Sequence, residues 1–417
     1  MKLRVDNFAL IKHAEIDIDG ITVIAGNNNS GKSTVGKILY SIFAALTNLD
    51  KKIQKQRESA IHDAVRFALF DSLKPDEVYA RFSIVRYLER AVVEGLAHKN
   101  LDWDFIFSTL RDKYDNDLSQ AVKDKIKNEV YIVCNWPNEK LLEQSLRDTF
   151  NGVFNNQINS LYCPKKEANI TLDIKDKSTF ISFQHNDITN YSSDIKLLHK
   201  AIYYSSPLVI DFIDSMRLPD IIFRQLSGLL ADYSFAATDE MNLFAKSLQI
   251  GRLENVFEKI KSVIPGQVVR DGRSYALQLP QFKEPIALKN LSTGLKAFMV
   301  LKMLLEANVI NRRDVVVLDE PEIHLHPTWQ LLYAELIVLL QKEFDLSVVI
   351  TTHSNFFLNA IETYSRKYAT VDKVKLYLAD VQADGAVMKD VTNNPELIYQ
   401  KMAVAVDVLT SERLSYE

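Results

Sequence analysis

The nine residues Gly26–Thr34, GNNNSGKST, constrain the fold more than any other part of the chain. They stand between a short apolar run, Ile21–Ala25, and a stretch from residue 32 to about 46 whose apolar residues recur at helical spacing. The spacing G-x-x-x-x-G-K-[ST] between a buried strand and a helix is typical of a phosphate-binding loop. The residues that meet this spacing are Gly26, Gly31, Lys32 and Ser33. The pattern therefore predicts an α/β fold in which this strand and helix hold a phosphate group.

The chemistry of phosphate binding explains the residue types in this loop. Glycine adopts positive φ and lets backbone N–H groups approach phosphate oxygens, which the positive end of the following helix also attracts. Lys32 supplies a mobile cation, and Ser33 places a hydroxyl on Mg²⁺. Asn28 and Asn29 are expected to replace a loop glycine, because asparagine tolerates left-handed backbone. The residues expected to bind nucleotide are Asn27, Asn28, Asn29, Ser30, Gly31, Lys32, Ser33 and Thr34.

A second segment, VVVLDEPEIHLHP at 315–327, supplies carboxylates at the end of an apolar run. A run of this kind is typical of a strand buried in a parallel sheet. Asp319 is expected to hold Mg²⁺, and Glu320 to orient or deprotonate the attacking water. About 30 residues later, VVITTHS ends another apolar run, and His353 is expected to contact the γ-phosphate. The two runs together predict a hydrolytic site.

Between these segments, NLSTGLKAF at 290–298 marks the start of a helix. Free N–H groups and the hydroxyl of Ser292 at such a start form an anion site. Two interpretations stay open. Ser292 is a plain N-cap, or Ser292 and Gly294 cover the γ-phosphate of a nucleotide that another subunit holds.

The order of these segments resembles the ABC-type ATPase heads shared by SMC proteins, recombination-repair ATPases and the OLD (overcoming lysogenisation defect) family. DEPEIHLHP is characteristic of the OLD-like branch, which is common in prokaryotic anti-phage systems. The resemblance implies an α/β head of the P-loop NTPase kind, with a mixed, mainly parallel sheet interrupted by a mostly helical insertion. It also implies an ATPase with ATP and Mg²⁺ as cofactors, acting as a homodimer or higher oligomer that sandwiches ATP head to tail.

Carried over to this chain, the resemblance makes Asp319 the metal carboxylate, Glu320 the catalytic base and His353 the switch. Ser292 and Gly294 would then act on the partner's nucleotide. Two features depart from the family. The signature reads LSTGLK, and no glutamine is evident for the Q-loop, for which Gln184 and Gln225 are candidates.

Domain limits follow from changes in pattern. We expect the N-terminal part of the head at 1–48 and a helical insertion at 49–165. Strand hairpins and helices at 166–285 would complete the head and the insertion, with one hairpin at 169–183 and another through Asp271-Gly272. The C-terminal part of the head would lie at 286–380, followed at 381–417 by a hairpin through Asp384-Gly385 and a helix. Within the head, Glu322, His324 and His326 could form a small metal site, although a structural role in the loop is favoured.

Composition limits the possible partners. A net charge of -4 gives no general attraction for nucleic acid, and no apolar run is long enough to span a membrane. Cys134 and Cys163 lack metal-type spacing and are interpreted as reduced thiols of a cytoplasmic protein. Only about 40 residues follow the last expected core strand, too few for the nuclease domain of OLD-family proteins. We therefore expect a separate effector, either a toxin or a nuclease, in anti-phage defence.

Two alternatives remain open. In the first, the chain is an SMC-like recombination or repair ATPase whose insertion contacts DNA. The basic run Lys51, Lys52, Lys55 and Arg57 could then bind the phosphate backbone, although such a run is more often a solvated helix face. In the second, the chain is itself a nuclease, which no carboxylate cluster outside the head supports.

Overall fold

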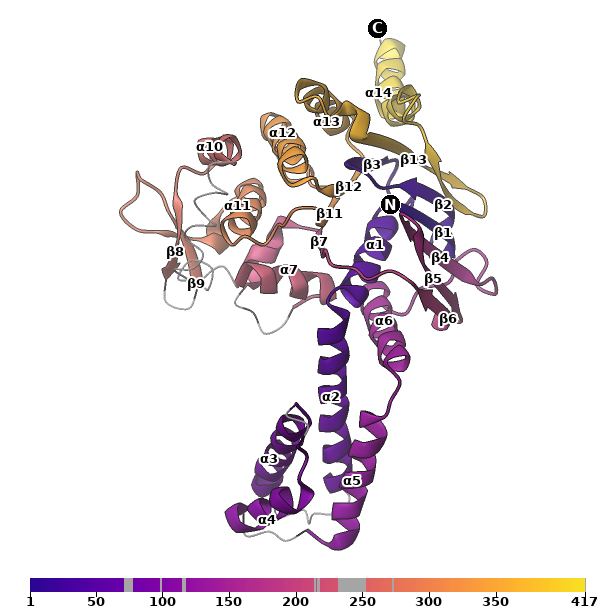
Figure 1. Ribbon diagram of the computed structural model, residues 1–417. Coiled ribbons are helices and arrows are strands. Elements are labelled where there is room, and N and C mark those ends of the chain that lie inside the picture. The colour runs from indigo at the N-terminus through magenta and orange to yellow at the C-terminus, as the bar shows by residue number, and fades with distance from the viewer. Residues whose placement is uncertain are drawn as a thin grey trace. The chain divides into compact units, whose positions relative to one another are not determined.

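The computed structural model describes residues 1–70, 78–97, 100–114, 118–213, 215, 218–231, 253–271 and 274–416. The chain divides into two compact units. The head consists of Met1–Thr47 and Arg147–Glu417, and the helical unit is Asn48–Leu146. The helical unit therefore covers the first part of the insertion expected at 49–165, whose remaining residues belong to the head. Figure 1 labels the elements of both.

The head is built on one mixed sheet with the strand order β6-β5-β4-β1-β2-β14-β13-β3-β12-β11-β7. Its strands are β1 Lys2–Phe8, β2 Ile11–Asp17, β3 Ile21–Ala25, β4 Ala168–Ile174, β5 Lys177–Gln184, β6 Asp187–Ser193, β7 Ala201–Tyr204, β11 Val315–Asp319, β12 Ser347–Thr352, β13 Val374–Gln382 and β14 Gly385–Asp390. From β13 to β7 every neighbouring pair is parallel, whereas β6 to β2 are antiparallel. The predicted α/β class is confirmed.

The parallel strands are buried on both faces, which explains their uninterrupted apolar sequences. On one face, helix α1 (Lys32–Leu46) packs against β7, β11 and β12. The other face packs into a core with helices α11 (Thr293–Glu306), α12 (Pro327–Phe344) and α13 (Asn355–Lys367). Each fully buried Val or Leu contributes roughly 1.5–3 kcal/mol. Burial against these helices therefore stabilises the parallel strands.

A smaller antiparallel sheet also belongs to the head. It has the order β10-β9-β8, with β8 at Gln267–Asp271, β9 at Ser274–Gln278 and β10 at Ile286–Ala287. Its neighbours in the chain are the helices α7 (Ile221–Ala231) and α10 (Glu254–Val263), and α10 packs on α11 and α12. The residues expected at 266–280 thus form a sheet of their own, while those at 168–184 extend the main sheet.

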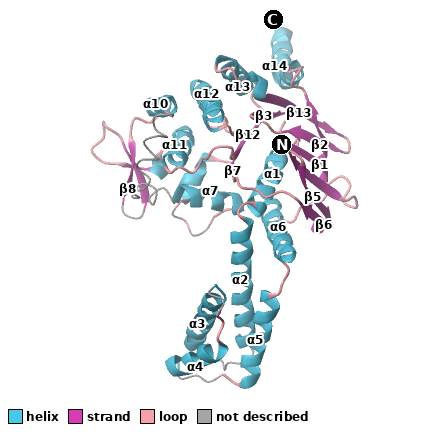
Figure 2. Ribbon diagram, in the orientation of Figure 1, coloured by secondary structure: helices cyan, strands magenta, loops and turns pink. Residues whose placement is uncertain are grey.

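The helical unit contains α2 (Leu49–Phe70), α3 (Val78–Ala97), α4 (Trp103–Tyr114) and α5 (Gln120–Cys134). Helix α6 (Asn138–Phe154) begins in this unit and ends in the head. The unit has its own apolar core, in which Val65, Leu88 and Ile126 are fully buried. Figure 2 shows its helices and, by contrast, the strands of the head. No helix in the described ranges is long and apolar enough to cross a membrane.

Turn chemistry predicted the hairpins well. The expected hairpins at 169–183 and through Asp384-Gly385 are confirmed as β4–β5 and β13–β14. The strands β8 and β9 pair as expected, but the turn residue Gly272 lies outside the described residues. Three short strands, β6, β7 and β10, were not predicted. Their sequences carry few β-branched residues or stand next to turn-forming residues, so tertiary packing decided their conformation.

Candidate active site

The loop after β3 has the backbone that its glycines predict. Gly26 and Gly31 have φ values of 153° and 79°, a region that residues with a Cβ rarely adopt. Asn29 also takes a left-handed conformation, with φ of 61°, as expected. Asn28 does not have positive φ, so that part of the prediction was wrong. Helix α1 then begins at Lys32 without a side-chain cap, which leaves its first N–H groups for another acceptor.

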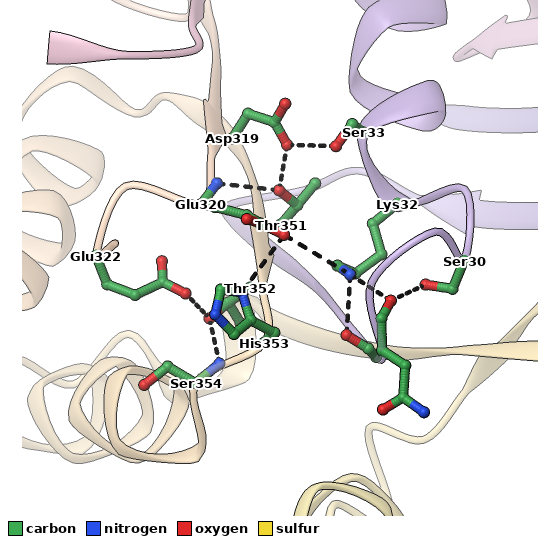
Figure 3. Close-up of polar contacts among 12 residues, drawn as sticks. Ser30, Lys32, Ser33, Asp319, Glu320, Glu322, Thr351, Thr352, His353 and Ser354 are labelled. Atoms are coloured by element: carbon green, nitrogen blue, oxygen red, sulfur yellow. Dashed lines mark hydrogen bonds and ion pairs between the residues drawn. The ribbon is translucent and has the colours of Figure 1, made fainter. Parts of the chain in front are cut away.

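Lys32 is the buried cation of the site. Its side chain is only 4% exposed, and Nζ donates to the carbonyls of Gly26 at 2.9 Å and Asn27 at 2.7 Å (Figure 3). Ser30 Oγ donates to the same Asn27 carbonyl at 2.7 Å. Burial lowers the pKa of Lys32, and the nearby carboxylates of Glu320 and others only partly offset this. The ammonium is thus held by loop carbonyls where the phosphate loop faces the carboxylates.

Asp319 lies at the end of β11 and accepts hydrogen bonds from three hydroxyl groups. Ser33 Oγ and Thr351 Oγ1 donate to its Oδ1, at 2.8 and 2.5 Å. Tyr203 Oη donates to Oδ2 at 2.8 Å. The register explains the second contact, because Asp319 and Thr351 are opposite each other on the parallel strands β11 and β12. A serine hydroxyl beside an oriented carboxylate is a set of hard oxygen ligands that suits Mg²⁺.

Glu320 has a left-handed backbone, with φ of 48°, which is uncommon for a residue with a side chain. Its N–H donates to both the carbonyl and the hydroxyl of Thr351, each at 3.1 Å, and these bonds hold it in this conformation. Glu320 Oε1 lies 3.8 Å from Lys32 Nζ and 3.4 Å from His353 Nδ1. Figure 3 shows these three side chains converging from separate segments. The turn thus directs Glu320 away from Asp319 and toward the cation and the histidine.

Hydrogen bonds hold the end of β12, where Thr352 precedes His353. Thr352 Oγ1 donates to the buried carboxylate of Glu322 and accepts the N–H of Ser354 at 3.0 Å. Ser354 Oγ accepts the N–H of Phe357 and caps α13, a contribution of about 1 kcal/mol. Burial raises the pKa of Glu322. His353 is therefore fixed between two anchored neighbours.

A cavity of about 160 Å³ opens beside Ser33, Asp319 and Glu320. The segment after β7 closes its other side with Tyr204, Ser205 and Pro207, and the loop after Glu320 adds Pro321, Ile323 and His324. Ser205 Oγ is buried here and has no hydrogen-bond partner within the described part of the chain. The cavity is thus lined by residues of three segments, the start of α1, the end of β7 with the residues after it, and the end of β11 with the loop after it.

Comparison with known proteins identifies the family. The family model described as "AAA domain, putative AbiEii toxin, Type IV TA system" matches residues 50–359. This chain belongs to that family. The chain is a P-loop ATPase, as the sequence predicted. The matched span contains Asp319, Glu320 and His353, and the phosphate loop precedes it.

Solved structures similar to the ATPase include SMC heads. One is an SMC head bound to the C-terminal winged-helix domain of ScpA, with 14% identity over 95% of this chain and 98% of that one, at a TM-score of 0.46. Another is the SMC head domain from Thermotoga maritima, with 12% identity over 94% and 98%, at 0.38. A third is an SMC head with an extended coiled coil, bound to a ScpA domain from Pyrococcus furiosus, with 12% identity over 99% and 98%, at 0.40.

Ser292 and Gly294 lie at the start of α11. Ser292 is exposed, and its Oγ accepts the N–H of Leu295 at 3.4 Å as an N-cap. Gly294 is buried under Trp329, whose ring atoms a Cβ at this position would meet at 3.0 Å. The capping role thus accounts for the position of Ser292, whose side chain lies at the protein surface.

The other metal-ligand candidates of the sequence do not form a metal site. His324 and His326 are exposed while Glu322 is buried, and among the described residues no group of three such side chains could hold a metal ion. His326 instead caps α12, where its Nδ1 accepts the N–H of Thr328. The metal-site alternative was therefore wrong, and the structural role is confirmed for His326.

Neither glutamine considered for the Q-loop lines the cavity. Gln225 donates to the carbonyl of Ala201 at 3.2 Å, and Gln184 ends β5, far from β3 in the strand order. Ser205 stands immediately after β7 and lines the cavity instead.

One residue of the basic run considered for DNA binding already uses its guanidinium group within the protein. Arg57 donates hydrogen bonds to the carbonyls of Val133 and Trp136 at 3.1 and 3.2 Å.

Sequence reasoning missed Tyr203, Ser205 and Thr351. Thr351 stands in the segment VVITTHS and Tyr203 and Ser205 in YYSSP, both of which look like ordinary strand ends. Only the parallel pairing of β7, β11 and β12 brings Tyr203 and Thr351 to Asp319. A search for polar residues at the ends of all short apolar runs could have found them.

Proposed function

We propose that this ATPase binds ATP with Mg²⁺ in the cavity formed by the phosphate loop and the ends of β11 and β12. The observation that carries the proposal is the convergence of Lys32, Ser33, Asp319, Glu320 and His353 from segments up to about 320 residues apart. The carboxyl ends of parallel strands are the usual ligand site of such sheets. A lysine, a hydroxyl and a carboxylate pair at one such edge suit hydrolysis of a phosphoanhydride.

The residues fit the metal that this chemistry requires. Ser33 and Asp319 offer oxygen atoms that are already in contact, and the cavity beside them is lined by further polar atoms. Mg²⁺ is held in this way by one or two protein oxygens together with substrate phosphates. When bound, the ion would neutralise charge on the phosphates. Ser33 and Asp319 are the residues that would hold it.

The remaining side chains would act on the nucleotide and on water. Lys32 would exchange its loop carbonyls for the β- and γ-phosphates, and the N–H groups of residues 27–34 would surround those phosphates. Glu320 would orient and deprotonate the attacking water, because its turn directs the carboxylate away from Asp319. His353, 3.4 Å from Glu320, would contact the γ-phosphate and report its presence.

Replacing the base tests the site. Glu320→Gln should bind ATP as well as the wild type and hydrolyse it at least 100-fold more slowly, since a general base contributes about 10²–10⁴-fold. Lys32→Ala should lose ATP binding. Glu343→Gln is the matched control, because it makes the same change of carboxylate to amide at an exposed position of α12. It should leave ATP binding and ATP hydrolysis unchanged. Phosphate release and binding of a fluorescent ATP analogue are the measurements. Wild-type turnover by Glu320→Gln would overturn the role of Glu320.

We extend the proposal to assembly. The ATPase would form a homodimer around ATP, with the exposed Ser292 and the start of α11 of one chain facing the nucleotide of the other. Glu320→Gln with ATP and Mg²⁺ should then elute as a dimer, measured by light scattering. Ser292→Asp should elute as a monomer, because it adds a negative charge next to the phosphates. A Glu320→Gln protein that stays monomeric at saturating ATP would contradict the dimer.

In the cell we propose an OLD-like role in anti-phage defence, in the cytoplasm, through control of a separate toxin or nuclease. The family description, which names a toxin of a toxin–antitoxin system, supports this role. Expression of the chain together with its neighbouring genes should reduce plaque formation, and Lys32→Ala should restore it. Unchanged plaque counts with the complete locus would reject the defence role, while the hydrolysis measurements would still stand.

A further inference from the structure

Strand β7 brings a tyrosine hydroxyl to the carboxylate of Asp319. The strand runs parallel to β11, with Tyr203 opposite Val317 and Tyr204 opposite Leu318. Tyr204 packs into the core with α11 and α12, so Tyr203 points to the other face, toward α1. From there Tyr203 Oη donates to Asp319 Oδ2 at 2.8 Å. Nothing in the sequence motifs assigns a function to this residue.

The hydroxyl is held in place by its surroundings. Tyr203 is fully buried, and its ring packs edge to face against Tyr40 of α1, with centroids 5.8 Å apart. Helix α1 approaches closely because residue 36 is glycine. A Cβ there would meet Val317 at 2.6 Å and the ring of Tyr203 at 3.4 Å. These contacts hold the hydroxyl of Tyr203 in a fixed position.

The two oxygens of Asp319 are used differently. Oδ1 accepts from Ser33 and from Thr351, whereas Oδ2 accepts from Tyr203. A carboxylate has about four acceptor directions. Three are occupied by these hydroxyls, and the fourth is on Oδ2. Tyr203 is the donor that shares Oδ2 with this direction, and its hydrogen bond, together with those on Oδ1, fixes the rotation of the planar carboxylate.

We propose that Tyr203 is a positioning residue that orients Asp319 for Mg²⁺. The inference rests on the proposed function, in which Asp319 holds the metal. Mg²⁺ requires near-ideal octahedral geometry, so a carboxylate that rotates freely binds it less well. Partners that hydrogen-bond to metal ligands typically contribute 10–100-fold to metal affinity or activity. Simple core packing by the ring would contribute nothing of this kind.

The test removes one oxygen atom and titrates the metal. Tyr203→Phe keeps the ring, and the Mg²⁺ concentration that gives half-maximal hydrolysis should rise about 10-fold. Binding of a fluorescent ATP analogue in EDTA should not change. The midpoint does not depend on how much of the protein is folded, so a destabilised variant can still be measured.

Tyr377→Phe is the matched control. Tyr377 is equally buried, on β13, and its hydroxyl accepts the N–H of Asp17 at 2.8 Å without contacting Asp319. Its Mg²⁺ midpoint should equal that of the wild type. An unchanged midpoint in Tyr203→Phe, or an equal rise in both variants, would overturn the inference.

Asp319→Asn separates this inference from the proposed function. The variant should lose Mg²⁺-dependent hydrolysis. If it responds to Mg²⁺ like the wild type, Asp319 does not hold the metal, and both the proposed function of Asp319 and the inference on Tyr203 fail. If Asp319→Asn is inactive and Tyr203→Phe has the wild-type midpoint, only the inference fails.

Discussion

Two carboxylates in the head, one partly buried and one buried, each accept hydrogen bonds from three side chains, but the donors differ in charge. At the end of β11, Asp319 accepts from the neutral hydroxyls of Ser33, Tyr203 and Thr351. Where α10, α12 and α13 meet, Glu335 of α12 accepts from two lysines and a tyrosine. These bonds, at 2.5–2.7 Å, come from Lys259, Lys367 and Tyr368.

The consequence is visible in the pKa of Glu335. Burial alone would raise it, but the bonds from Lys259, Lys367 and Tyr368 outweigh burial and lower it to about 2. Glu335 is therefore neutralised within the protein and ties three helices together. Hydroxyl donors orient Asp319 without neutralising it, so its charge remains available to a cation. The charge of the donors thus distinguishes a structural carboxylate from a candidate metal ligand.

The largest expected effect tests this distinction on activity. Asp319→Asn should reduce ATP hydrolysis at least 100-fold, because a metal ligand contributes several kcal/mol to stabilising the transition state. Glu335→Gln should hydrolyse ATP within about twofold of the wild type at a temperature where it is folded, since its partners neutralise it away from the cavity. Steady-state phosphate release checks both variants. A similar loss in Glu335→Gln would show that the two carboxylates do not differ in function.

A smaller effect concerns stability at the helix junction. Glu335→Gln should lower the free energy of unfolding by about 2 kcal/mol at pH 7. This is below the 3–5 kcal/mol of a fully buried pair, because Lys367 is 56% exposed. Urea unfolding followed by circular dichroism is the measurement, with the exposed Glu343→Gln as control.

The pH dependence of Glu335 has a definite sign. Its folded pKa lies below the unfolded value, so its contribution is fully present above about pH 4.5 and is lost as pH falls toward 2. The difference in unfolding free energy between wild type and Glu335→Gln should therefore shrink over this range. A difference that stays constant with pH would mean that the glutamate contributes by shape and not by charge.

The smallest expected effect concerns a third carboxylate, Glu322, which forms no ion pair within the described residues and does not line the cavity. Thr352 donates to its Oε1, but Oε2 is buried without a partner within the described residues. Burial raises its pKa, so the folded state binds the proton more tightly and stability declines as pH rises above about 4.5. Glu322→Gln should therefore be more stable at pH 7, by on the order of 1 kcal/mol.

Unfolding of Glu322→Gln at pH 5 and pH 8 checks this. The gain should be larger at pH 8, where the wild-type carboxylate is more often ionised. Glu320, His353 and Lys32 interact with the carboxylate of Glu322 and not with an amide, so the comparison measures their net effect together with that of burial. A variant less stable than the wild type at pH 8 would show that the charge of Glu322 has a stabilising partner.

Local sequence predicted much of the fold and part of the site. The spacing of Gly26, Gly31, Lys32 and Ser33 predicted a strand, a loop and a helix, because glycine conformations and apolar periodicity act over a few residues. Turn residues predicted the hairpins β4–β5 and β13–β14 for the same reason. The prediction for Asn28 failed because neighbouring backbone, not residue type, decided which asparagine took positive φ.

The sequence by itself determined that an apolar strand ends in Asp319 and Glu320, and that a phosphate loop precedes α1. Only the tertiary structure decided which side chains surround those carboxylates. Tyr203 lies 116 residues from Asp319 along the chain, and Thr351 lies 32 residues away. Strand pairing over such separations leaves no local pattern, because any apolar strand can pair with another. The same holds for Glu335, whose lysine partners come from helices on either side of α12 in the sequence.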